Sequence, residues 1–166
     1  MKKWLSVWAA VLLLLLGLTA CQDKGADSSS GSRAIGDFQA GGVSVALGQE
    51  YTEALGNSLG GATDVVEAPS CHYDGMDTIY TFAGFALYTY RAEDKSIIYL
   101  IELKDDTAAT REGAKVGMTA GEIEALYGTG YTESGVIRSY PLGKDATLDF
   151  TMEDGKAALI EYVAKS

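Results

Sequence analysis

Two tight-turn dipeptides, Ala83-Gly84 and Asp154-Gly155, each separate two runs of apolar and β-branched residues. Such runs joined by a short Gly-containing connection are typical of β-hairpins. Each set of runs follows a short amphipathic segment that ends in glycine. The chain therefore repeats one pattern, a short helix followed by a meander of strands. The predicted strands are 77–82, 85–91, 96–103, 135–140, 147–152 and 157–163, with shorter ones at 43–47 and 70–73.

Both predicted helices are short. In the first, Tyr51, Leu55 and Leu59 recur every four residues, which is the spacing of one helix face. The second begins at Thr119 and has Glu122 three positions later. That spacing is a capping box, in which each side chain accepts a hydrogen bond from the other residue's backbone N–H.

Together these patterns predict an α+β protein. We expect two tandem helix-plus-antiparallel-meander units, residues 37–106 and 107–166, that form one curved sheet with the short helices packed on one face.

The first 20 residues have the features of a bacterial export signal. A lysine-containing start is followed by an apolar run over 9–18, which is too short to span a membrane comfortably. The run ends in Leu18-Thr19-Ala20-Cys21. This ending resembles the lipobox of bacterial lipoproteins, and the resemblance implies cleavage before Cys21 and lipidation of its thiol. An ordinary secretory signal with a chance Cys is the alternative interpretation.

If Cys21 is lipidated, the protein is anchored to the cell membrane on its extracytoplasmic side. Residues 21–36 are rich in Ser, Gly and charged side chains. We expect them to form a flexible tether between the anchor and the folded part. Whether the host envelope is Gram-positive or Gram-negative stays open.

Charge limits the classes of partner. The chain has 13 Lys and Arg against 23 Asp and Glu, a net charge of −10. Binding to nucleic acid requires a basic surface that replaces phosphate counterions, so we expect no nucleic-acid partner.

Cysteine and histidine are too few for common catalytic or metal sites. Cys71 and His72 are adjacent, and no other His exists. Neighbours in a strand point to opposite faces, and a zinc site needs three or four converging ligands. We expect no metal, no cofactor and no enzymatic activity. If Cys21 is lipidated, Cys71 is either buried, reactive or paired between molecules. Because free Cys is among the most buried residue types, we expect it to be buried.

Hairpin register indicates which sheet face is free. A two-residue turn at 83–84 places Tyr80 opposite Leu87, and the turn at 154–155 places Phe150 opposite Leu159. We expect these apolar residues to form the core. The opposite face is a candidate protein-binding surface, although an ordinary half-solvated sheet has the same composition. Strand 96–103 is apolar on both faces and is left unassigned. The candidate binding residues are Asp77, Ile79, Thr81, Tyr88, Tyr90, Asp149, Thr151, Ile160 and Tyr162.

Short motifs resemble known families. Gly117-Met118-Thr119, with Glu122, Ile123 and Tyr127-Gly128, resembles the helix–sheet unit of SmpA/BamE-type lipoproteins. Two such units resemble the architecture of β-lactamase-inhibitor proteins (BLIP). The segment 70–77 is similar to lipoproteins of anaerobic Gram-positive bacteria. These resemblances imply a non-catalytic protein-binding lipoprotein of the cell envelope. The alternative is a lipoprotein that binds a small ligand for a transporter.

Overall fold

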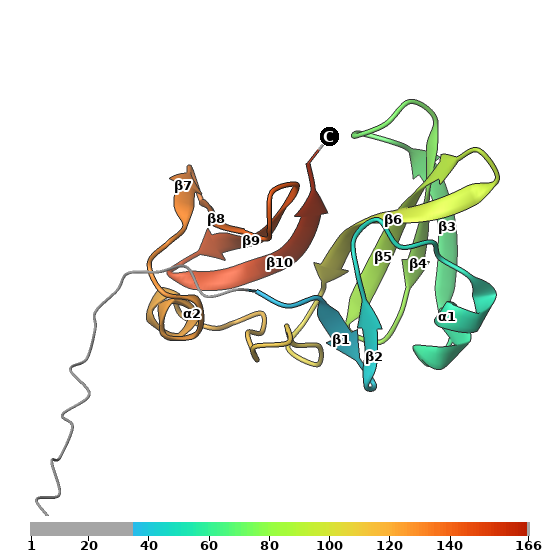
Figure 1. Ribbon diagram of the computed structural model, residues 1–166. Helices are drawn as coiled ribbons and strands as arrows, with labels where there is room; N and C mark the ends of the chain where they lie inside the picture. The colour runs from blue at the N-terminus through green and yellow to red at the C-terminus, as the bar shows by residue number, and fades with distance from the viewer. Residues whose placement is uncertain (1–34, 166) are drawn as a thin grey trace, which may run out of the picture.

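The computed structural model describes residues 35–165, in which antiparallel strands are the main secondary structure. Eight strands form one sheet: β3 (Asp64–Pro69), β4 (Met76–Thr81), β5 (Phe85–Ala92), β6 (Lys95–Leu103), β7 (Thr132–Ser134), β8 (Ile137–Pro141), β9 (Ala146–Glu153) and β10 (Lys156–Ala164). Their order across the sheet is β3-β4-β5-β6-β10-β9-β8-β7. Each half of the sequence supplies four neighbouring strands, and the halves join where β6 pairs with β10 (Figure 1).

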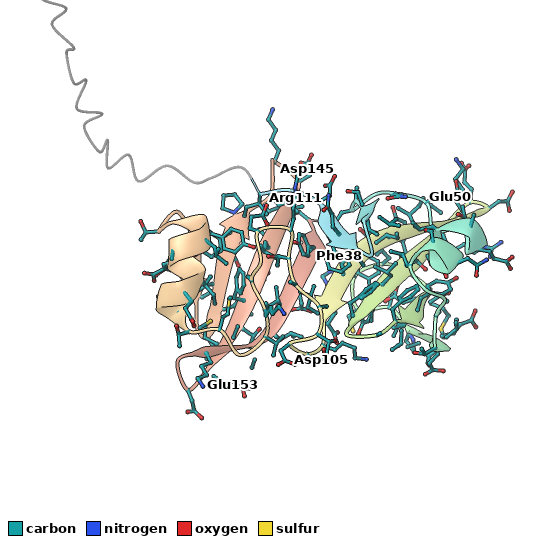
Figure 2. The ribbon with its side chains drawn as sticks, turned by 90° about the horizontal axis from the view of Figure 1, so that it is seen from below. Phe38, Glu50, Asp105, Arg111, Asp145 and Glu153 are labelled. Carbon is teal, nitrogen blue, oxygen red and sulfur yellow. The ribbon has the colours of Figure 1, made fainter. Side chains whose placement is uncertain are left out.

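Other segments cover one face of this sheet. They are the hairpin of β1 (Phe38–Ala40) and β2 (Val43–Val45), the connection 104–119, and the helix α2 (Ala120–Tyr127). Figure 2 views the molecule with these segments in front of the sheet. The helix α1 (Glu53–Ser58) lies at the end of the sheet that carries β3 (Figure 1). We call the sheet face beneath the β1–β2 hairpin, the connection 104–119 and α2 the covered face, and the opposite sheet face the outer face.

The predicted α+β class is wrong, because the protein is mostly β. The helices have only six and eight residues, and much of the material over the sheet is the β1–β2 hairpin and the non-helical connection. Glycine weakens one of the two helices and ends the other. Gly56 lies within α1, where its backbone entropy is unfavourable, and α2 ends at Gly128.

Aromatic side chains hold the covering segments to the sheet. Phe38 of β1 is fully buried. Its ring centroid lies 4.9 Å from that of Phe85 on β5 and 6.0 Å from that of Tyr162 on β10, so it bridges the two halves. Within the second half, Tyr127 of α2 packs against Phe150 of β9, with ring centroids 5.6 Å apart.

Several local predictions are confirmed. The capping box of α2 is formed by Thr119 and Glu122. The hairpin at 83–84 has the predicted register, with Tyr80 opposite Leu87. At the second turn Asp154 and Gly155 both have positive φ, 49° and 76°, as a type I′ hairpin turn requires.

A β-bulge in β10 overturns the predicted faces of this strand. Ala157 is opposite Met152 as expected, but Leu159 is opposite Thr151 and Ile160 is opposite Phe150. One extra residue reverses the inside and outside positions that follow it. Ile160 and Tyr162 were expected on the exposed face. They are instead buried in the core, with 0% and 1% of their surface exposed.

A second bulge explains why strand 96–103 is apolar on both faces. The register of β6 against β5 shifts so that Leu100 is opposite Tyr88 and Ile98 is opposite Thr89. Tyr99 is the extra residue. Ile98 and Ile101 join the core, whereas Tyr99 and Leu100 lie toward the outer face.

Some elements were predicted wrongly or missed. The segment 70–73 is a loop between β3 and β4 rather than a strand, and β1, β3 and β7 were not predicted. The predicted strand 43–47 is the shorter β2, which pairs with β1 outside the main sheet. The predicted signal, Cys21 and nearly all of the tether lie outside the described residues.

Candidate binding face

An apolar row of side chains crosses the outer face. Strand pairing places Val66, Ile79, Tyr88, Leu100 and Val163 side by side on β3, β4, β5, β6 and β10. Val66 is 46% exposed, and Leu100 is the most buried of the five. The apolar row is therefore a partly exposed hydrophobic strip on a face that the covering segments leave free.

An acidic row lies next to it, two residues further along the strands. Glu161 of β10 is opposite Glu102 of β6 on one side and Asp149 of β9 on the other. Like charges directly opposite each other in a sheet are unfavourable. The ion pairs among the described residues involve other carboxylates, so none neutralises this row.

The central carboxyl of the acidic row responds to this environment. Partial burial raises the pKa of Glu161, and the neighbouring charges of Glu102 and Asp149 raise it further. Tyr88 donates a hydrogen bond to Oε2 of Glu102 at 2.7 Å. Burial and this bond to a carboxylate raise the pKa of the Tyr88 hydroxyl. Oδ1 of Asp149 is buried and has no hydrogen-bond partner in the part of the chain that the structure describes.

Glu161→Gln is expected to raise the free energy of unfolding at pH 7 by about 1 kcal/mol, because it removes two like-charge pairs. A carboxyl whose pKa rises on folding contributes stability below its unfolded pKa and loses it as the pH rises through the folded pKa. The gain in unfolding free energy from Glu161→Gln should therefore become smaller as the pH falls to about 4. Urea unfolding at both pH values checks this, with the exposed Glu153→Gln as control. A Glu161→Gln variant no more stable than wild type at pH 7 would contradict it.

The loop 70–75 folds back over the outer face. Ser70 Oγ accepts hydrogen bonds from the backbone N–H groups of His72 and Tyr73, at 3.2 and 3.0 Å. The ring of Tyr73 stacks on Tyr90 with centroids 3.9 Å apart and meets the edge of Tyr99 at 5.1 Å. The aromatic contacts thus fix the loop above β5 and β6.

A pocket of about 250 Å³ opens beneath this loop. It lies where the apolar and acidic rows meet. Its carboxylates come from Asp77, Glu102 and Glu161, and its aromatic walls include Tyr88 and Tyr99. The pocket is therefore acidic and aromatic together.

Asp77 is the most deeply placed of these carboxylates, with 4% of its surface exposed. Its Oδ2 accepts a 2.5 Å hydrogen bond from the Tyr99 hydroxyl. Its Oδ1 is buried with no partner among the described residues. A buried carboxylate oxygen without a donor is unfavourable, so a hydrogen-bond donor that reached Oδ1 would stabilise the site.

The predicted binding residues divide into three groups. Asp77 is buried beneath the loop rather than freely exposed. Ile160 and Tyr162 belong to the core, as the β10 bulge requires. The others are half-buried on the outer face: Ile79, Thr81, Tyr88, Tyr90, Asp149 and Thr151.

Sequence reasoning missed several residues of this face. Tyr99 and Leu100 were hidden by the β6 bulge. Glu102 and Glu161 were missed because their pairing joins strands far apart in the sequence. Val66 was missed with its strand, although the run Asp64-Val65-Val66 has the composition of an edge strand.

The structure places Cys71 at the surface of the described region. Cys71 is exposed in the loop, which corrects the expectation that it is buried. Within residues 35–165, no group of three or more His, Cys, Asp or Glu is arranged to hold a metal ion.

Comparisons with known proteins add no family. No protein-family model, curated protein or solved structure matches this chain. The resemblances to SmpA/BamE-type and BLIP-like proteins stay predictions. Neither α1 nor α2 is long and apolar enough to cross a membrane.

Proposed function

We propose that this chain is a membrane-anchored lipoprotein of the bacterial cell envelope whose outer sheet face binds another protein without catalysing a reaction. The observation that carries the proposal is the pair of rows on that face. Apolar side chains lie beside carboxylates that no ion pair neutralises, with tyrosine between them. Contact with a protein partner is more favourable for such a surface than contact with water. Tyrosine provides contact area and a polar tip at low entropic cost.

The dimensions of the face support this role. Seven spacings of about 4.8 Å between eight strands give a width of roughly 34 Å. The central strands β5, β6, β9 and β10 have eight or nine residues, or roughly 27–31 Å at about 3.4 Å per residue. A standard interface needs about 800 Å² per partner, which a sheet of this size can supply.

The proposed anchor would keep the folded part close to the membrane. The lipobox-like sequence ending at Cys21 supports lipidation, and the Ser- and Gly-rich segment after it supports a tether. The acidic folded part would be repelled from anionic lipid. This repulsion is consistent with an orientation in which the outer face is turned away from the membrane and is free to bind a protein.

Binding through the outer face can be tested with two neighbouring valines of β3. Val66 is 46% exposed on the outer face, and Val65 is 54% exposed on the other side of the strand. We expect Val66→Arg to weaken partner capture at least tenfold, because a long charged side chain would disrupt the apolar row. Val65→Arg is the matched control and should leave capture unchanged.

The measurement uses the full-length chain with a C-terminal tag, cross-linked in cells of its own species and identified by mass spectrometry. A protein held by wild type and Val65→Arg but lost from Val66→Arg supports the proposal. Equal capture by all three, or equal loss from both variants, would show that the outer face is not the binding surface. A co-purified small molecule in place of a protein would favour the transporter-associated alternative.

A further inference from the structure

We propose that the pocket beneath loop 70–75 receives the guanidinium group of an arginine side chain of the protein partner. This inference rests on the proposed function and specifies the chemistry of its partner. It is carried by the composition of the pocket and by a buried oxygen that lacks a donor.

The pocket is lined by negative charge, which favours a cationic ligand. Asp77 lines it on one side of the apolar row and Glu102 and Glu161 line it on the other, and no Lys or Arg of the described chain does so. Across its neighbouring strands Glu161 is opposite Glu102 itself and one further carboxylate, that of Asp149. A positive group placed here would replace repulsion with attraction in a partly desolvated site, where charge interactions are stronger than in water.

Asp77 provides the independent observation. Its side chain is 96% buried, since only 4% of its surface is exposed. Tyr99 donates a hydrogen bond to Oδ2, whereas Oδ1 has no donor within residues 35–165. Asp77 lines the pocket, so an N–H group that enters and reaches Oδ1 would supply the missing hydrogen bond.

The shape and walls favour guanidinium over other cations. The aromatic rings of Tyr88, Tyr99 and His72 line the same pocket, and a planar guanidinium stacks on aromatic faces while donating several hydrogen bonds. An ammonium has fewer donors and no plane. Residues 35–165 hold no three-ligand arrangement for a metal ion. A volume of about 250 Å³ suits one side chain rather than a larger ligand.

The test uses the full-length protein in detergent with ¹³C-labelled tyrosine rings, titrated with N-acetyl-arginine amide. We expect saturable shifts of the Tyr88 and Tyr99 signals. N-acetyl-citrulline amide has nearly the same shape without the charge and should give none. N-acetyl-lysine amide should bind several-fold more weakly than the arginine probe.

Glu161→Gln is the decisive variant, because it is expected to fold at least as well as wild type. It should weaken the arginine probe about tenfold, whereas Glu153→Gln should have no effect. Equal shifts from citrulline, or an arginine affinity unchanged in Glu161→Gln, would overturn the inference.

The result also separates the two proposals. Capture that depends on Val66, without any response to the arginine probe, would retain the binding face and reject the pocket. A specific response to the probe without partner capture would retain a guanidinium site and reject the protein partner as its source.

Discussion

Ile160→Ala is expected to lower the free energy of unfolding by about 2–5 kcal/mol, whereas Leu159→Ala should lower it by about 1 kcal/mol or less. Ile160 is fully buried in the core, opposite Phe150. Leu159 is half-buried on the other side of the same strand. The difference arises because truncation at Ile160 leaves a cavity that the packed sheet cannot fill.

The two variants are matched probes of the β10 bulge. Without the bulge, Leu159 would face the core and Ile160 the outer face, as the hairpin turn alone predicts. Urea unfolding measures both changes, and the slope of the transition checks that the unfolded state is unchanged. A larger loss of stability in Leu159→Ala than in Ile160→Ala would show that the strand has the unbulged register.

Tyr99→Phe is expected to lower the free energy of unfolding at pH 7 by about 1–3 kcal/mol, even though it removes a single oxygen. The lost hydroxyl donates the 2.5 Å hydrogen bond to Oδ2 of Asp77. Oδ1 already lacks a partner among the described residues, so the variant would leave a buried carboxylate with no donor from them. The penalty comes from the uncompensated group rather than from the loss of packing.

A double-mutant cycle separates these two causes. Asp77→Asn combined with Tyr99→Phe should cost less than the sum of the single changes, because the neutral amide does not leave a buried charge. Tyr90→Phe is the control, since its ring stacks on Tyr73 and its hydroxyl has no hydrogen bond among the described residues. Additive losses, or a loss in Tyr90→Phe as large as in Tyr99→Phe, would contradict a specific role for the Asp77–Tyr99 bond.

The acidic row links stability to the proposed function. Glu161 lies between two like charges, an arrangement that lowers the stability of the free protein. Residues that bind partners are often unfavourable in isolation, and replacing them stabilises the fold at the expense of binding. Glu161→Gln is therefore expected to act in opposite directions on unfolding and on the arginine probe.

Local features of the fold could be predicted from the sequence because neighbouring residues decide them. Asp154-Gly155 sets a hairpin turn through its backbone conformation, and Thr119 caps α2 by bonding within one helical turn. The first hairpin correctly placed Ile79, Tyr88 and Tyr90 on the outer face. In that hairpin no extra residue separates the turn from these positions.

The rest required the tertiary structure. A bulge after Ala157 adds one residue without any polar or glycine signal, because Leu159 and Ile160 are both apolar. Local alternation therefore could not show which of the two faces the core. The fold class was likewise decided by packing, because the β1–β2 hairpin and the connection 104–119 cover much of the sheet.

The candidate site was beyond prediction for a related reason. The sequence by itself determined the turns, the helix cap, the acidic balance and most of the strands. Only the pairing of β6 with β10 brought Glu102 beside Glu161, although they are far apart in the chain. Such pairings depend on which distant strands bury the most apolar surface together, and that quantity is a property of the whole fold rather than of any local segment.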